Sequence, residues 1–233
     1  MTRRALVTGA SSGIGWELAR LMAEKGYHVV ATARRRERLE ALSRQYPGRI
    51  EPVVADLTAK GSLDLLEEKA SGGLDVLVNN AGFGVAKGVL EQDAREIEEQ
   101  FLVNVVRPLQ LIRRLVGYMG EGGVVVNVVT AGVHVVMAGL PVYGASKAAL
   151  HYASRALREK LSSRGIRLVE VLPGPVRTEF FARAGLETPR FAVDPARAAK
   201  IILSAVERGR GVVYIPFYLG FLRVFDALPP SFY

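Results

Sequence analysis

The 233-residue chain is long enough for one α/β domain with a large core, and no shift in composition divides it in two. It contains no cysteine, which excludes disulfides, thiolate metal sites and a cysteine nucleophile. The net charge is +8, but no zinc-finger spacing and no basic-aromatic platform indicates nucleic-acid binding, so we interpret the excess as a dispersed, solvated surface.

No apolar run approaches the roughly 18–20 residues that span a bilayer, so we expect no transmembrane segment. A strand-like run begins already at Ala5, and we therefore expect no signal peptide and a cytoplasmic protein.

Strand-like and helix-like segments alternate along the whole chain. Short apolar runs predict seven strands, at residues 5–8, 29–33, 50–55, 76–79, 124–129, 168–172 and 212–215. Helices are expected at residues 14–25, 37–45, 63–69, 94–119 and 195–207, and around Tyr143 through residue 161. This alternation predicts an α/β, Rossmann-like, doubly wound parallel sheet at residues 1–215, with ligands at the carboxyl ends of the strands. Residues 216–233 are expected to form an apolar tail, packed on this domain or on a partner subunit.

A glycine-rich turn, T-G-A-S-S-G-I-G at residues 8–15, joins the first strand to the first helix. Its glycines allow a tight turn and close approach of a ligand to the backbone. The free N–H groups and positive end of the helix then suit a diphosphate. The spacing differs from the usual G-x-G-x-x-G, because residue 18 is leucine.

Tyr143 and Lys147 are four residues apart on a predicted helix, so both side chains project from one face. A nearby ammonium favours phenolate and lowers the phenol pKa from its usual value of about 10, which would give an acid or base usable near neutral pH. A tyrosine and a lysine at this spacing are usually ordinary surface residues, so a catalytic role needs support from other motifs in the chain.

These motifs together resemble the short-chain dehydrogenase/reductase family over nearly the whole chain. Residues 8–15 resemble its T-G-x-x-x-G-x-G turn, residues 79–82 its N-N-A-G segment and residues 173–178 its P-G-x-V-x-T segment. Tyr143 and Lys147 match its Y-x-x-x-K pair, and Asn104 falls where the family has an active-site asparagine. Five motifs in family order are specific, whereas any one of them is weak.

The resemblance implies an NADP(H) cofactor. No carboxylate follows the second strand before Glu37, where folds that bind NAD usually place one, and Arg34 stands where NADP-preferring members carry a base that can bind the 2′-phosphate. The open alternative is that these arginines are only a solvated helix start. The expected cofactor-binding residues are Gly9, Ser11, Ser12, Gly13, Ile14, Gly15, Arg34, Asp56, Leu57, Asn80, Ala81, Gly82, Tyr143, Lys147, Pro173, Gly174, Val176 and Thr178.

The implied reaction interconverts a carbonyl and an alcohol by hydride transfer, with Tyr143 as acid or base. Lys147 would lower the pKa of Tyr143 and hold the nicotinamide ribose, and Asn104 would hold a water that resupplies protons. Thr130 stands where the family usually has a serine, and its hydroxyl would hydrogen-bond the substrate oxygen. An alternative alignment puts Val129 at that position and leaves no hydroxyl.

Residues 179–193 are expected to form a flap whose phenylalanines indicate a small-to-medium apolar substrate. The segment 217–228 is expected to cover the pocket or another subunit rather than lie on lipid. The resemblance implies a homodimer or homotetramer, formed through the helices of Asn104 and Tyr143. Two alternatives remain open: a steroid, retinoid or acyl-chain reductase of the same fold, and a non-catalytic NADP(H)-binding regulator.

None of the three histidines has metal-ligand spacing, so we expect no metal site. His28 and His134 show no partner in the sequence. His151 lies one helical turn beyond Lys147, where a packing or subunit-contact role is favoured over proton transfer.

Overall fold

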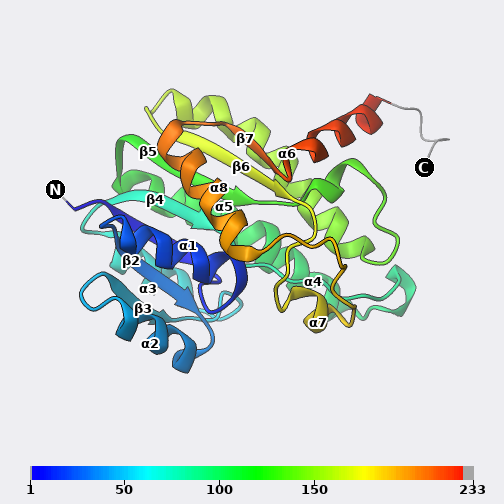
Figure 1. Cartoon of the computed structure of the whole chain (residues 1–233), viewed down its shortest axis with the longest axis horizontal. Coiled ribbons are helices and arrows are strands. Elements are labelled where there is room, and N and C mark those ends of the chain that lie inside the picture. The colour runs from blue at the N-terminus through cyan, green and yellow to red at the C-terminus, as the bar shows by residue number, and fades with distance from the viewer. Residues whose placement is uncertain (1, 228–233) are drawn as a thin grey trace.

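Seven parallel strands form the central layer of the fold, in the order β3-β2-β1-β4-β5-β6-β7. The computed structural model describes residues 2–227 (Figure 1). The strands are β1 Arg4–Thr8, β2 His28–Ala33, β3 Ile50–Val54, β4 Leu74–Asn79, β5 Met119–Val128, β6 Arg167–Pro173 and β7 Val212–Ile215. The predicted doubly wound parallel sheet is therefore confirmed.

Helices cover both faces of the sheet (Figure 1). The first face carries α1 (Gly13–Glu24), α2 (Arg36–Gln45) and α8 (Pro195–Arg208), and the second carries α3 (Ser62–Ala70), α5 (Arg107–Leu115) and α6 (Pro141–Ser162). The remaining α-helices are α4 (Ala94–Phe101) and α7 (Phe180–Ala184). Among the helices of residues 2–227, none combines the length and the apolar character needed to cross a bilayer.

The core has two halves because strand side chains alternate between the faces of the sheet. Val124 and Val126 of β5 belong to the cluster under α1, α2 and α8, whereas Val125 between them belongs to the cluster under α3, α5 and α6. Burial on both faces explains why the strands read as continuous apolar runs in the sequence.

The strand order reverses between β1 and β4, where a doubly wound sheet opens a crevice for a ligand. Hydrogen bonds join the two strand ends there. The hydroxyl of Thr8 accepts from the backbone N–H groups of Asn80 and Ala81, both at 3.0 Å, and the Asn80 side chain donates to the Thr8 carbonyl at 2.9 Å. The glycine turn and the N-N-A-G segment therefore meet at the reversal.

The single helix expected at residues 94–119 is wrong. A π-helical segment, η2 (Leu102–Val106), separates α4 from α5, and Met119 already begins β5, ahead of the strand expected from residue 124. Val103, Asn104 and Val105 are all buried in η2, so the wider turn directs an extra residue inward, which a strict 3.6-residue repeat does not predict.

In the predicted apolar tail, residues Phe217–Ala227 form the 3₁₀-helical segment η5. A Cβ placed on Gly174 would lie 2.6 Å from Leu219, so η5 packs close against the P-G-x-V-x-T segment. The last part of the predicted tail, residues 228–233, lies outside the described residues.

Candidate active site

Lys147 and Asn104 converge on Gly82 of the N-N-A-G segment, and Tyr143 lies against Gly84 just beyond it. Tyr143 and Lys147 lie in the first two turns of α6, and the Lys147 ammonium is 5.9 Å from the centre of the Tyr143 ring. A Cβ on Gly82 would lie 2.9 Å from Asn104 Oδ1 and 3.1 Å from Lys147 Nζ, and one on Gly84 would lie 3.0 Å from Tyr143 Cβ. At both glycines the predicted site residues approach the backbone so closely that an added Cβ would press against their side chains.

Burial sets the protonation of this pair. It raises the pKa of the Tyr143 phenol and lowers the pKa of the Lys147 ammonium to about 8. The net direction differs from the lowered pKa expected for Tyr143, because burial outweighs the charge of Lys147. The physical reason is desolvation, which penalises the charged form of each group. Lys147 Nζ donates to the Val128 carbonyl at 2.9 Å, which fixes the ammonium at the end of β5.

Asn104 is fully buried, and its side-chain amide forms hydrogen bonds with neighbouring protein groups. Its Nδ2 donates to the Phe83 carbonyl and to Ser146 Oγ, both at 2.9 Å, and its Oδ1 accepts from the Phe83 N–H at 3.1 Å. Both amide hydrogens are thus occupied, so a water could bond only to the second lone pair of Oδ1.

Thr130 follows β5 and begins the short 3₁₀ segment η4 (Ala131–His134). Its hydroxyl donates to the Pro173 carbonyl at 3.2 Å and accepts from the Gly132 N–H at 3.2 Å. A hydroxyl has one hydrogen, so Thr130 must release Pro173 before it can donate to a substrate oxygen. Val129, the alternative candidate, has no hydroxyl and is buried.

The glycine turn wraps the start of α1. Gly9 and Gly13 adopt positive φ angles of 69° and 56°, and a Cβ on Gly15 would lie 2.4 Å from the Gly9 carbonyl oxygen. The first turn of α1 contains no acidic residue, and the Ser12 side chain makes no capping hydrogen bond. The N–H groups at this helix start are therefore not satisfied by a side-chain cap, which suits an anion.

Two neighbouring arginines follow β2 and differ in their surroundings. Arg34 is exposed and lies near Asp56; burial alone would raise the pKa of that carboxyl, but hydrogen bonds from Thr58 and the charge of Arg34 lower it. Arg35 instead donates to Ser11, from Nε to Oγ at 3.1 Å and from Nη2 to the carbonyl at 3.1 Å. The side chain of Leu57, one of the expected cofactor-binding residues, is buried in the core.

The P-G-x-V-x-T segment leads into the predicted flap. Val176 pairs with Val193 in an isolated bridge that closes the base of this loop, and α7 lies between them. A Cβ on Gly13 would lie 2.7 Å from the Thr178 methyl group, so the loop crosses directly over the glycine turn.

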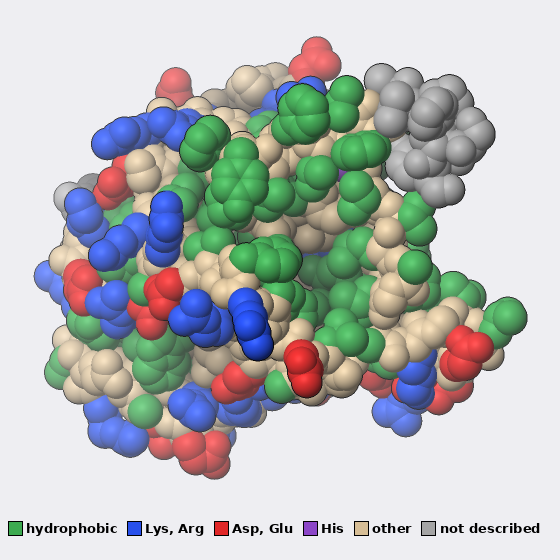
Figure 2. Space-filling model, turned by 45° about the vertical axis from the view of Figure 1, so that its right-hand side comes forward, with side chains coloured by type: hydrophobic (Ala, Val, Ile, Leu, Met, Phe, Trp, Pro, Cys, Tyr) green, Lys and Arg blue, Asp and Glu red, His purple; other side chains and the backbone are tan. Residues whose placement is uncertain are grey.

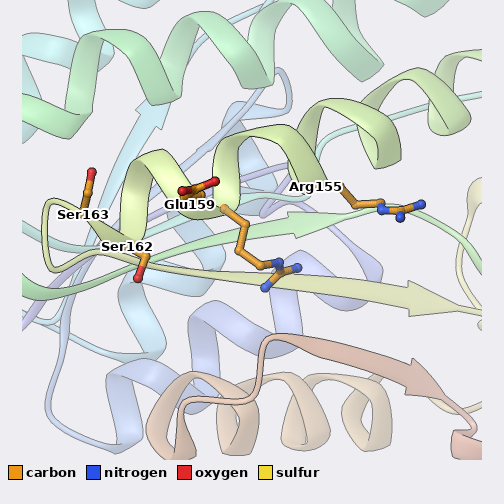
Figure 3. A pocket seen from close by; sticks show the side chains of 5 residues that line it. Arg155, Glu159, Ser162 and Ser163 are labelled. Atoms are coloured by element: carbon orange, nitrogen blue, oxygen red, sulfur yellow. The ribbon is translucent and has the colours of Figure 1, made fainter.

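Apolar side chains surround the phenol of Tyr143. The Phe180 ring lies 5.0 Å from the Tyr143 ring, and Leu140, Ala184, Ala86 and Met137 complete the cluster. Hydrophobic side chains also gather around a hollow on the face of the molecule that Figure 2 shows. Another hollow, lined by Arg155, Arg158, Glu159, Ser162 and Ser163, lies near the far end of α6 and contains no predicted site residue (Figure 3).

The histidines make contacts that the sequence did not reveal. His134 is buried, with Nδ1 3.0 Å from both carboxylate oxygens of Asp226 and Nε2 2.9 Å from the Tyr214 hydroxyl. The sequence showed no partner for His134 because Asp226 and Tyr214 are distant from it in the chain. His151 Nδ1 lies 2.7 Å from the buried Glu170. Among the described residues, no group of three or more histidine and acidic side chains could hold a metal ion.

Residues 3–188 match the sequence profile of the short chain dehydrogenase family. The chain belongs to this family. This membership confirms the family predicted from the motifs and makes the protein an oxidoreductase that acts on CH–OH and C=O groups.

Individual members of the short-chain dehydrogenase family are similar over most of their length. The serine 3-dehydrogenase of Agrobacterium fabrum is 32% identical over 77% of this chain and 74% of its own. An uncharacterised oxidoreductase of Staphylococcus aureus is 30% identical over 87% and 90%. The structure of a short-chain dehydrogenase from Sphingobium yanoikuyae in complex with NADPH superimposes with a TM-score of 0.84 at 30% identity, covering 92% of this chain and 88% of that one.

Proposed function

We propose that this short-chain dehydrogenase is an NADPH-dependent reductase of apolar carbonyl compounds that also runs as an alcohol dehydrogenase. The observation that carries the proposal is that Lys147 and Asn104 meet at Gly82 and Tyr143 lies against the neighbouring Gly84, beside the glycine turn. An active-site phenol, ammonium and amide in one place favour turnover over a purely regulatory role.

The residues fit a dinucleotide. The start of α1 lacks acids and a side-chain cap, and the glycines of the turn sit where a Cβ would collide with backbone or with Thr178. We infer that this turn holds a diphosphate, that Asp56 and the N-N-A-G segment hold the nucleoside ends, and that Lys147 holds a ribose. The NADPH complex of the Sphingobium relative supports NADP(H) as the ligand.

A reduced nicotinamide, when bound, supplies a hydride to the carbonyl carbon. In reduction, Tyr143 Oη donates its proton to the carbonyl oxygen, and in oxidation the tyrosinate takes that proton back. Because burial raises the pKa of Tyr143, the phenol is held protonated at neutral pH, as an acid must be. Lys147 lies close enough to favour the tyrosinate that forms after proton donation.

The apolar cluster around Tyr143 supports an apolar substrate. Phe180, Leu140 and Met137 offer no partner for a carboxylate or an ammonium, and burying either group unpaired is costly. We therefore expect a substrate unlike the amino acid named for the Agrobacterium relative.

Cofactor binding and turnover can be separated experimentally. NADPH fluorescence should change on addition of the protein, and a panel of aldehydes and ketones should then include compounds that oxidise bound NADPH. Binding without oxidation by any carbonyl compound would favour the regulator.

Arg34 is the residue we propose to recognise the ribose 2′-phosphate. It is exposed beside Asp56, and a guanidinium can bond a phosphate through two N–H groups. Arg34→Asp should shift the ratio of NADPH to NADH affinity at least tenfold toward NADH, measured by fluorescence titration. An unchanged ratio would remove Arg34 from this role.

We also infer a homodimer or homotetramer that uses the helices around Asn104 and Tyr143. Val106 in η2 and Tyr152 on α6 are apolar side chains exposed on these elements. Sedimentation equilibrium should give a mass two or four times that of the chain.

A further inference from the structure

Arg35 links the glycine turn to the flap. Its Nε and Nη2 bond to Ser11, as described above, and its Nη1 donates to Glu179 Oε2 at 2.8 Å. Glu179 is the residue immediately before α7. One guanidinium therefore contacts both the turn that is expected to hold a diphosphate and the first residue of the segment that covers it.

The residues on either side of Glu179 touch the two halves of the site. Thr178 packs against Gly13 of the glycine turn, and Phe180 packs against the ring of Tyr143. The backbone also fastens the far end of α7, because the Ala86 N–H donates to the Ala184 carbonyl at 3.0 Å. Movement of residue 179 would thus change the contacts of Phe180 with the phenol.

Glu179 is surrounded by positive charge. Burial alone would raise the pKa of its carboxyl, but the hydrogen bond and charge of Arg35 and the charges of Arg183 and Arg38 lower it, so the group is ionised at neutral pH. Arg183, one turn along α7, contacts the same carboxylate oxygen from within the flap. Of these contacts, the one with Arg35 crosses between the flap and the glycine turn.

We propose that Glu179 is a positioning residue whose ion pair with Arg35 closes α7 over the glycine turn and slows release of the cofactor. The inference rests on the proposed function. It assigns the two arginines different tasks: Arg34 recognises the 2′-phosphate, whereas Arg35 holds the flap. Because closure acts on the whole dinucleotide, the ion pair should slow the release of NADPH and of NADH to the same extent.

Stopped-flow release of each cofactor tests this assignment. Glu179→Ala should accelerate release of NADPH and of NADH by about two- to fivefold, the range expected for a partly exposed pair. Arg183→Ala is the matched control, because it removes the other guanidinium on Glu179 and leaves the bridge to Arg35 intact. The double variant Arg35→Ala/Glu179→Ala should release no faster than Arg35→Ala alone.

Unchanged release in Glu179→Ala, tighter binding of NADPH, or a changed ratio of NADPH to NADH would overturn the proposal. Tighter binding would mean that the carboxylate competes with the cofactor for Arg35.

Amide hydrogen exchange tests the same bridge without a cofactor. The N–H groups of Arg183, Gly185 and Leu186 donate within the flap and report its closure. They should exchange faster in Glu179→Ala but not in Arg183→Ala, apart from local effects at residue 183 itself. Equal exchange in the wild type, Glu179→Ala and Arg183→Ala would refute the closing role of the Arg35–Glu179 pair. This result does not require a nicotinamide nucleotide to bind, so this proposal and the proposed reductase function can fail separately.

Discussion

Lys147 and Tyr143 are buried titratable groups whose protonation is coupled to folding. The pKa of Lys147 falls from its usual 10.5 to about 8, so between these values the unfolded chain binds a proton that the folded chain does not. Stability should therefore rise with pH from about 8 to 10.5. The raised pKa of Tyr143 acts in the opposite direction above pH 10, where the unfolded phenol loses its proton first.

Urea unfolding between pH 7 and 10 measures this dependence. The free energy of unfolding of the wild type should increase across pH 8 to 10, and Lys147→Met should remove most of that increase. Lys160→Met, on the exposed side of the same helix, should keep it. An equal increase in all three proteins would show that Lys147 is not the group responsible.

Thr130 combines a structural and a proposed catalytic task. Thr130→Val keeps the shape of the side chain but removes the bonds to Pro173 and Gly132. We expect a loss of about 1 kcal/mol in unfolding free energy from the missing cap and a fall of about 100-fold in kcat if the hydroxyl bonds the reacting oxygen. Thr130→Ser should restore both. Undiminished turnover in the valine variant would remove Thr130 from the mechanism.

At the scale of elements, the pair of His134 and Asp226 holds η5 to η4, the short segment that follows Thr130. The carboxylate is half exposed whereas the imidazole is buried, so their interaction should matter locally more than globally. Asp226→Asn should speed amide exchange along residues 217–226 and lower the unfolding free energy by less than about 1 kcal/mol. Arg223→Gln, on the same segment, is the control. Unaltered exchange would mean that Leu219 and its neighbours suffice to hold the segment.

Elements set by local pattern were predictable from the sequence, and elements set by distant contacts were not. The strands and the glycine turn follow from apolar runs and from residues that permit positive φ. The π-helical segment was not predictable from a 3.6-residue repeat, and its buried Asn104 bonds to Phe83, 21 residues away, a partner that no local pattern indicates. The segment η5 depends on packing against Gly174 and His134, which no local repeat encodes.

The same distinction applies to the site. Tyr143, Lys147 and Asn104 stand in motifs, and the structure brings them to two neighbouring glycines, Gly82 and Gly84. Arg35 and Glu179, 144 residues apart, have no local signal beyond a run of three arginines, so their pairing was missed. The pKa of Tyr143 was predicted in the wrong direction because spacing conveys the neighbouring charge but not the burial of both groups.

At the scale of the whole molecule, the candidate active site lies at the carboxyl ends of the strands. The order of the strands reverses between β1 and β4, and the turn, the N-N-A-G segment and α6 meet there. If the proposed reaction takes place there, removal of the Tyr143 phenol should abolish turnover. The fold and the binding of the nucleotide should persist.

Replacement of Tyr143 by phenylalanine tests that claim most directly. NADPH oxidation should be followed with the best apolar ketone of the panel, in the wild type and in Tyr143→Phe, after NADPH binding to both is verified by fluorescence. We predict retained binding and a kcat lowered at least 100-fold, the usual contribution of a positioned acid. An unchanged rate in the phenylalanine variant would contradict the account.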